Sequence, residues 1–220
     1  MKTLEYILNK YNLTIGESAK LEVRNTSRDT LAALLHELDF KTGVEVGVQR
    51  GLYSEVIARE NPQMKVYGID PWVPFTTCAA DPERNKTESR ASQGKCDQFY
   101  HETIERMRKY PNYEIIKGFS ISSSEKFEDG SLDFVYIDAN HDYPFVMDDI
   151  VTWSKKIRKG GILAGHDYFI LSDKRALLGV KQAVDTYVTE NNINPLLIWG
   201  LNAKEPGVLR DRIRSWSWVI

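Results

Sequence analysis

The stretch that decides the fold is "VEVGVQRGLYSEVIARE", which runs from Val44 to Glu60. Its beginning is rich in β-branched residues, as in a buried strand, and its end has the apolar spacing of an amphipathic helix. Gly47 and Gly51 lie between these two parts, where the chain must turn. A strand, a glycine-containing bend and a helix start within so few residues indicate either a ligand-binding turn or a simple connection.

Five short apolar segments, the first one within this stretch, carry glycine, aspartate or histidine at or near their carboxyl ends, as expected of strands that are buried on both faces. They are residues 43–48, 65–70, 113–119, 132–138 and 161–167. Helical patterns fill the intervals and the end of this region, at 53–60, 91–109, 120–127, 143–158 and 174–190. This alternation predicts an α/β fold, in which a parallel sheet is covered by helices on both faces.

The two ends of the chain add further elements. Strands are predicted at 195–200 and 215–220, and they can pair as an antiparallel hairpin because the connection between them has no helical period. Two helices are predicted before residue 40, the second one capped by Ser27. Residues 73–95 form a long polar stretch, which is typical of a lid, a binding loop or a disordered segment.

The composition is that of a soluble globular protein. The 220 residues are 42% hydrophobic and 27% charged, which suits a single domain. The net charge of −2 disfavours a nucleic-acid partner. Because the chain lacks both an apolar run of about 20 residues and the apolar core of a signal peptide, we expect a cytoplasmic protein without a membrane partner. Cys78 and Cys96 are too few for a disulfide framework or a zinc site, although one bridge between them stays open.

The bend in the opening stretch lies where such a sheet binds ligands, beyond the carboxyl ends of its strands. Gly47 and Gly51 would let a ligand approach the backbone closely. The next strand ends in Asp70, whose carboxylate can accept hydrogen bonds from both hydroxyls of a ribose. A dinucleotide site would require glycine where Gln49 stands, and the acidic Glu45 would repel a pyrophosphate but suit a cationic ligand. These residues therefore indicate a nucleoside site.

The segment "VEVGVQRGLYS" resembles the first motif of class I S-adenosylmethionine-dependent methyltransferases, in which an acidic residue precedes a glycine loop. The resemblance covers residues 40–220 and leaves 1–39 as an N-terminal helical cap, placed over the active site or at a homodimer contact. It implies a Rossmann-like, seven-stranded, mostly parallel sheet with an antiparallel C-terminal strand. It also implies S-adenosylmethionine as the cofactor. An NAD-dependent oxidoreductase and a nucleoside-binding module without catalysis are the alternatives.

The resemblance also assigns the cofactor contacts. The acidic residue and the glycine loop would hold the methionine part, Asp70 would hold the ribose, and the end of the third strand would contact the adenine. Trp72 could cover the adenine or the substrate, or belong to the core. The expected cofactor-binding residues are Glu45, Gly47, Gly51, Ser54, Asp70, Trp72, Phe119 and Asp138.

Polar side chains gather at the ends of two neighbouring strands, in "YIDANHDY" (136–143) and "GHDYF" (165–169). They are Asp138, Asn140, His141, Asp142, His166 and Asp167. Asp142 can serve as the N-cap of the following helix, but helix capping does not account for the other five residues. Oxygen and imidazole groups suit Mg²⁺ or Mn²⁺, and such a cation would stabilise the deprotonated form of a substrate hydroxyl.

These two segments resemble the small-molecule O-methyltransferases of the catechol and caffeoyl-coenzyme A type, and still more the bacterial sugar and macrolide O-methyltransferases. The resemblance implies a small-molecule hydroxyl acceptor, with Asp138, Asp167 and His166 at a metal. It implies His141 as the catalytic base, helped by Asp138, because His141 stands where the catechol type has a lysine. The catechol type reads Asp-Asn where this chain reads His166-Asp167, so the metal can be absent, different or held by other residues. The sequence does not show which molecule accepts the methyl group.

Overall fold

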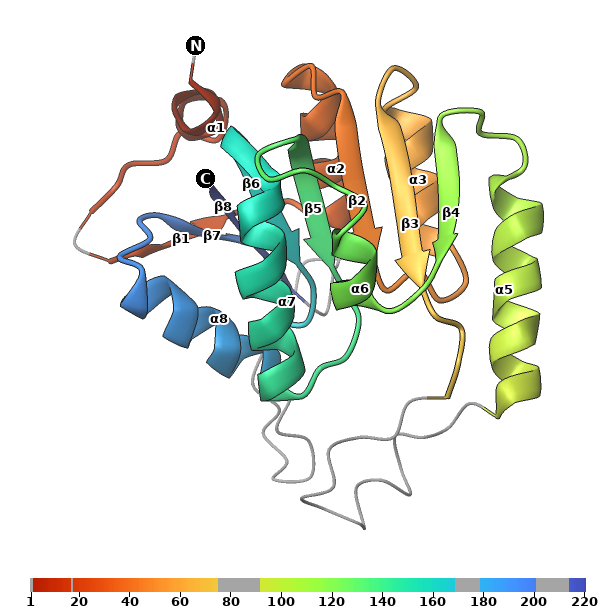
Figure 1. Ribbon diagram of the computed structural model, residues 1–220. Helices are drawn as coiled ribbons and strands as arrows, with labels where there is room; N and C mark the ends of the chain where they lie inside the picture. Colours follow the sequence, from red (N-terminus) through yellow and green to blue (C-terminus); the bar gives the residue numbers. More distant parts are fainter. Residues whose placement is uncertain (1, 17, 75–91, 169–178, 201–213) are drawn as a thin grey trace.

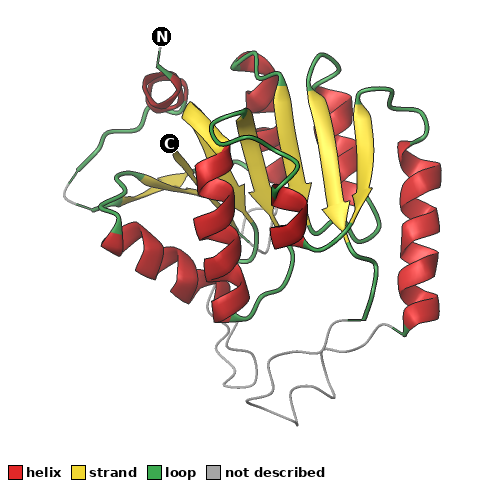
Figure 2. Ribbon diagram, in the orientation of Figure 1, coloured by secondary structure: helices red, strands yellow, loops and turns green. Residues whose placement is uncertain are grey.

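The structure is a computed structural model that describes residues 2–16, 18–74, 92–168, 179–200 and 214–220 (Figure 1). Within these residues the chain forms one eight-stranded sheet with helices on both faces, as Figure 2 shows. The strands are β1 (Lys20–Val23), β2 (Thr42–Val46), β3 (Lys65–Asp70), β4 (Tyr113–Lys117), β5 (Leu132–Ile137), β6 (Ile157–Gly165), β7 (Leu196–Trp199) and β8 (Ser215–Val219). The helices are α1 (Thr3–Lys10), α2 (Arg28–Glu37), α3 (Leu52–Glu60), α5 (Gln93–Met107), α6 (Ser120–Ser124), α7 (Tyr143–Lys156) and α8 (Gly179–Glu190).

The strand order is β1-β7-β8-β6-β5-β2-β3-β4. Every neighbouring pair is parallel except those that include β8, which is antiparallel to both β6 and β7. This pairing confirms the predicted antiparallel hairpin at the end of the chain. From β2 the chain first builds β3 and β4 on one side and then returns to build β5 and β6 on the other. The strand order therefore reverses between β2 and β5, and ligands bind at such a reversal in open α/β sheets.

The sheet has one strand more than the resemblance implied. The additional strand is β1, which pairs in parallel with β7 and places Lys20 opposite Leu196. The N-terminal segment 1–39 is therefore not only helical, because it also supplies an edge strand of the main sheet. This strand has only four residues, in which Lys20 and Glu22 alternate with Leu21 and Val23. A pattern this short does not distinguish a strand from a loop.

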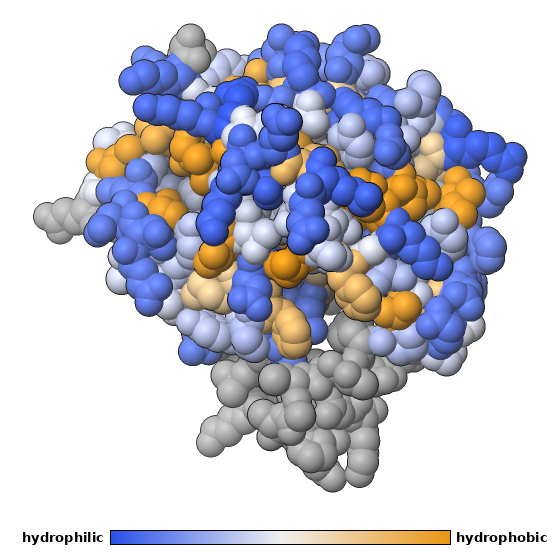
Figure 3. Space-filling view, in the orientation of Figure 1, coloured by the Kyte–Doolittle hydropathy of each residue, from blue (hydrophilic) through white to orange (hydrophobic). Residues whose placement is uncertain are grey.

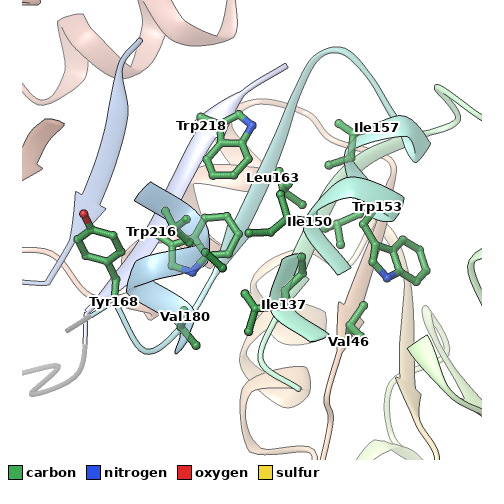
Figure 4. Packing of buried hydrophobic residues seen from close by; sticks show 14 of the residues in the cluster. Val46, Ile137, Ile150, Trp153, Ile157, Leu163, Tyr168, Val180, Trp216 and Trp218 are labelled. Carbon is green, nitrogen blue, oxygen red and sulfur yellow. The ribbon is translucent and has the colours of Figure 1, made fainter. Parts of the chain in front are cut away.

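Two hydrophobic clusters hold the layers together, one on each face of the sheet. The first packs β5, β6 and β8 against α7 and α8 and includes Ile150, Trp153 and Leu163 (Figure 4). In this cluster the rings of Trp216 and Trp218 stack with centroids 5.0 Å apart. The second cluster lies on the other face and joins α1, α2 and α3 to the sheet. Because residues from both N-terminal helices belong to it, the segment 1–39 shares a core with the rest of the chain.

Several predictions about local features can be compared with the described residues. Ser27 caps α2, because its hydroxyl accepts hydrogen bonds from the N–H groups of Asp29 and Thr30. Cys96 is buried with a free thiol, whereas Cys78 and most of the polar stretch 73–95 lie outside the described residues. None of the described helices is long and apolar enough to cross a bilayer.

On the face seen in Figure 3, hydrophobic residues form separate groups among hydrophilic ones.

Candidate active site

A cavity of about 760 Å³ opens at the carboxyl ends of β2, β3, β4 and β5, where the strand order reverses. This volume falls in the range of roughly 300–1,000 Å³ that is usual for small-molecule sites. Most residues predicted to bind the cofactor line it, namely Glu45, Gly47, Asp70, Trp72, Phe119 and Asp138, and so does the predicted base His141. The cavity therefore brings together residues that are far apart in the sequence.

The two glycines of the opening stretch have different roles. Gly47 lines the cavity with φ +94°, and a Cβ atom there would lie only 2.0 Å from the carbonyl oxygen of Asp138. It is needed because β2 and β5 approach each other closely at this point. Gly51 has φ +70° and precedes α3, but it does not line the cavity. A Cβ atom there would lie 3.1 Å from the side chain of Thr103 on α5, so Gly51 serves the packing of the turn.

Asp70 is held in place by the backbone of the neighbouring loops. Its Oδ2 accepts a hydrogen bond from the N–H of Gln49 at 2.9 Å, and its Oδ1 accepts one from the N–H of Trp72 at 2.7 Å. Burial raises the pKa of this carboxyl, and the backbone hydrogen bonds oppose that rise. A carboxylate oxygen can accept more than one hydrogen bond, so both oxygens of this fixed group remain able to bind the hydroxyls of a diol.

The two aromatic residues of the predicted cofactor site differ in exposure. Trp72 is 2% exposed, and its indole N–H donates to the carbonyl of Gln49 at 2.7 Å. Its ring packs against Tyr100 of α5, with centroids 4.8 Å apart. Trp72 is thus both a core residue and a wall of the cavity. Phe119 is 63% exposed and lines the cavity, so it remains available to cover a ligand.

Glu45 is a buried acid at the base of the cavity. Its carboxylate accepts a hydrogen bond from Ser54, whose hydroxyl also lies 2.8 Å from that of Tyr113. Burial raises the pKa of Glu45 to about 8, and the hydrogen bond from Ser54 opposes this rise only in part. Ser54 was expected at the cofactor, but it is fully buried and does not line the cavity. Ser54 therefore contacts Glu45 and not the cavity, and its role at the cofactor stays a prediction.

The polar groups at the ends of β5 and β6 meet beside this cavity, as predicted. The Nε2 atom of His141 lies 3.0 Å from Oδ2 of Asp167 and 3.5 Å from Oδ1 of Asp138. The Nδ1 atom of His166 lies 3.7 Å from the Asp138 carboxylate and 3.6 Å from that of Asp167. The backbone bends sharply here, since Asp167 has φ +58°. Asp142 is the N-cap residue of α7, as the cap explanation expected, although its side chain does not make the capping bond.

The charges in this group modify the expected chemistry of His141. Burial disfavours its charged form, but hydrogen bonds to Asp138 and Asp167 outweigh burial and raise its pKa to about 10. For Asp167, burial would raise the pKa, but the hydrogen bonds from His141 and His166 lower it. His141 is consequently protonated at neutral pH in this arrangement and balances the charge of the carboxylates. The prediction of a neutral base assumed an unperturbed pKa near 6.5, which the two aspartates change.

The same group has the geometry of a metal site. One ligand atom from each of Asp138, His141 and Asp167 lies within 4.8 Å of the others. Two carboxylates and an imidazole are a donor set that suits Mg²⁺ or Mn²⁺. His166, which the sequence named as a ligand, approaches the same carboxylates but lies outside this closest set.

Several residues that line the cavity were not predicted, Arg28 and Asp149 among them. Arg28, at the start of α2, lies 4.0 Å from Asp138 and 5.1 Å from the centroid of the Tyr53 ring. Asp149 of α7 is a buried acid that reaches the cavity from the opposite face of the sheet. The cap residue Ser27 predicts α2, but nothing in the sequence indicates that this helix would place Arg28 near the end of β5. Asp149 falls on the apolar face of its helix, where a charged residue is itself unusual.

Comparison with known proteins identifies the family. A family model described as a methyltransferase domain matches residues 44–168, which is more than half of the chain. The chain belongs to this methyltransferase family. The match favours methyl transfer over the oxidoreductase alternative, in agreement with Gln49 in place of the dinucleotide glycine. No curated protein matches the sequence significantly.

Solved structures of other methyltransferases share the fold. An O-methyltransferase from Bacillus cereus, solved with S-adenosylhomocysteine, is 16% identical over 99% of this chain and 90% of that chain, with a TM-score of 0.55. The O-methyltransferase of tomaymycin synthesis from Streptomyces achromogenes, solved with S-adenosylmethionine, is 14% identical over 100% and 90%, with a TM-score of 0.57. The Rossmann-like methyltransferase architecture predicted from the sequence is thereby confirmed.

Proposed function

We propose that this methyltransferase transfers the methyl group of S-adenosylmethionine to a hydroxyl oxygen of a small molecule. The observation that carries the proposal is the order of acidic groups along one cavity. Asp70 is the last residue of β3, Glu45 lies near the end of β2, and Asp138 follows β5, three strands that are neighbours in the sheet. A diol, a cationic amino acid part and a reacting hydroxyl would each meet a carboxylate in that sequence.

The chain's own residues would perform three tasks. Asp70, fixed by two backbone N–H groups, accepts hydrogen bonds from the ribose hydroxyls. Glu45 faces the ammonium group of the methionine part, and that positive charge favours the ionised carboxylate, which burial alone disfavours. Gly47 keeps the floor of the cavity free of a side chain between them. The methyl transfer needs no protein nucleophile, since the substrate oxygen attacks the sulfonium methyl directly when both are held in line.

The proton of the substrate hydroxyl must leave during this reaction. Asp138, Asp167 and one imidazole would hold a divalent cation, whose chemistry when bound is to acidify the hydroxyl. His141 lies closer to the two carboxylates than His166 does, but one Nε2 atom cannot both bind the cation and take the proton. We therefore assign the metal-binding imidazole to His166 and the base to His141. With their charge balanced in this way, Asp138 and Asp167 no longer raise the pKa of His141, so its Nε2 becomes able to take the proton.

Radiolabelled S-adenosylmethionine and a panel of hydroxyl compounds test this function. We expect label in one class of acceptor, with a rate that falls on chelation by EDTA and returns with Mn²⁺. Absence of transfer to the whole panel, together with saturable binding of S-adenosylmethionine, would instead support a nucleoside-binding module.

A pair of variants separates the two histidines. His166→Gln should weaken the binding of Mn²⁺, measured by calorimetry. His141→Gln should leave Mn²⁺ binding nearly unchanged and lower the rate of transfer by about 10²–10⁴-fold, the usual size of a general-base contribution. If His141→Gln abolishes Mn²⁺ binding, His141 is the ligand and its role as base is wrong.

A further inference from the structure

A chain of three polar side chains runs from the core of the molecule to the cavity wall. The indole N–H of Trp153 lies 2.9 Å from the hydroxyl oxygen of Ser120, and the hydroxyl of Ser120 is hydrogen-bonded to Oδ1 of Asp149. Trp153 belongs to the hydrophobic cluster of Figure 4 and is fully buried. Its indole can only donate. Ser120 therefore accepts from Trp153 and has its own proton free to donate, so the direction of the chain is fixed.

This direction determines what Asp149 can offer to a ligand. Its Oδ1 is occupied as an acceptor by Ser120, while Oδ2 has no hydrogen-bond partner among the described residues. The residue is 4% exposed and lines the cavity. A buried carboxyl group with a partner for only one oxygen is costly unless something in the cavity satisfies the other.

The sheet topology indicates which part of the cofactor reaches Asp149, if the function proposed above is correct. Along the sheet edge the order is Asp138 after β5, Gly47 after β2, Asp70 at the end of β3 and Ser120 after β4. Neighbouring strands are about 4.8 Å apart. A nucleoside whose reacting end is at Asp138 and whose ribose is at Asp70 must place its base beyond Asp70, at the end of β4.

The walls at this end of the cavity suit an aromatic base. Phe119 and Ile121 flank Ser120, line the cavity and are 63% and 44% exposed, an unusual exposure for large apolar residues. They can cover the faces of a planar ring, while the polar chain that ends in Asp149 meets its edge. An adenine carries one strong donor on that edge, its exocyclic amine.

We propose that Asp149 is the residue with which this chain recognises adenine, through a hydrogen bond from the exocyclic amine to its free Oδ2. The proposal rests on the function proposed above and adds a specificity-determining residue on α7 to it. Trp153 donates to Ser120, and Ser120 in turn donates to Oδ1 of Asp149. Asp149 therefore faces the base as a hydrogen-bond acceptor.

The protonation of Asp149 is consistent with this role. Burial raises its pKa to about 7, and the hydrogen bond from Ser120 only partly offsets burial. A second donor at Oδ2 would stabilise the ionised form, as the amine of adenine does. Asp148, the adjacent acid, is exposed at the rim of the same cavity and offers a matched control.

The test compares S-adenosylhomocysteine with S-inosylhomocysteine, in which a carbonyl oxygen replaces the amine and N1 carries a hydrogen. Both compounds compete in one sample, so the ratio of their dissociation constants does not depend on the fraction of folded protein. Wild type should prefer the adenine compound by about 10- to 100-fold, because the carbonyl oxygen of the inosine compound and Oδ2 of Asp149 are both hydrogen-bond acceptors. Asp148→Asn should keep this ratio.

In Asp149→Asn the amide oxygen still accepts the hydrogen bond from Ser120, so the amide NH₂ faces the base as a donor. The preference for the adenine compound should fall to equality or reverse. Ser120→Ala, which removes the group that orients Asp149, should lower the preference by a smaller factor. An unchanged ratio in Asp149→Asn, or an equal change in Asp148→Asn, would overturn the assignment. Equal binding of both compounds to wild type would also overturn it, whereas binding of neither would refute the proposed function itself.

Discussion

The two ends of strand β5 carry aspartates in opposite circumstances. Asp133, near the amino end, accepts hydrogen bonds from the N–H groups of Lys41 at 2.6 Å and Thr42 at 2.9 Å, and from Arg158 at 2.5 Å. Asp138, just beyond the carboxyl end, lies 3.5 Å or more from any cationic nitrogen of the described residues and faces a second carboxylate. Both are the same residue type on one strand. The comparison shows that an acid held by backbone and arginine donors stabilises the fold. A pair of acids that shares only two imidazoles at a cavity is typical of a functional site.

The largest effect should come from Asp138→Asn, which acts at the ligand end. We expect methyl transfer to fall by about 10²–10⁴-fold, because the group that orients the hydroxyl and balances the cation is lost. The free energy of unfolding should change little, since the asparagine keeps a side-chain oxygen for His141 and no backbone N–H among the described residues donates to Asp138. Initial rates with an acceptor from the panel, together with urea unfolding, check both. A large loss of stability with normal activity would mean that Asp138 stabilises the fold and does not take part in the reaction.

The second effect comes from Asp133→Ala at the opposite end. It leaves two backbone N–H groups and one arginine without their acceptor, the buried Asp133 carboxylate, so the free energy of unfolding should fall by about 2–4 kcal/mol. The affinity for S-adenosylhomocysteine should hardly change. Urea denaturation and calorimetry measure the two quantities. Asp129→Ala is the control, because its ion pair with Lys156 is exposed on the aspartate side and should contribute nothing measurable.

A third variant tests the ribose contact within the cavity. Asp70→Ala should weaken the binding of S-adenosylhomocysteine by about 1–3 kcal/mol, because two hydrogen bonds to a charged acceptor are lost. Calorimetric titration of wild type and variant at equal salt gives the difference. A dissociation constant equal to that of wild type would rule out the ribose role of Asp70.

The smallest expected effect is a gain in stability, not a loss, and it comes from Glu45→Gln. Its pKa of about 8 in the folded chain lies above its ordinary value of 4.5, so the empty protein should lose stability as the pH rises through this interval. Glu45→Gln removes the cost of ionising a buried acid. We expect it to be more stable than wild type by about 1–2 kcal/mol at pH 8, with no gain at pH 4.5, and to bind S-adenosylmethionine more weakly. Thermal melts at the two pH values show the sign; equal stability at both would contradict it.

Much of the fold was predictable because its elements have long, strong patterns. The alternation of buried strands with amphipathic helices, and the glycine bend after Val46, predict the central sheet and the edge at which it binds ligands. Strand β1 was not predictable, because its four residues become a strand only by pairing with β7, which is far away in the sequence.

The candidate site was predictable where chemistry depends on position along a strand. Asp70, Asp138 and Asp167 each follow a strand end, and parallel strands bring such ends together. Arg28 and Asp149 come from helices, whose side-chain directions depend on how the helices pack on the sheet. Ser54 stays a prediction as a cofactor-binding residue, and α3 turns its side chain toward Glu45 and Tyr113, a direction that the sequence did not indicate. The pKa of His141 likewise depends on two neighbours that the sequence alone does not place.

The most direct test of the central claim is a calorimetric titration of the full chain with S-adenosylhomocysteine, with NAD as the comparison. A carboxylate-lined cavity at the reversal of strand order should bind one molecule of S-adenosylhomocysteine per chain and give no saturable heat with NAD. If folded protein gives no heat with S-adenosylhomocysteine, or if Asp70→Ala and Glu45→Gln bind it as well as wild type does, the acids of this edge do not form the cofactor site.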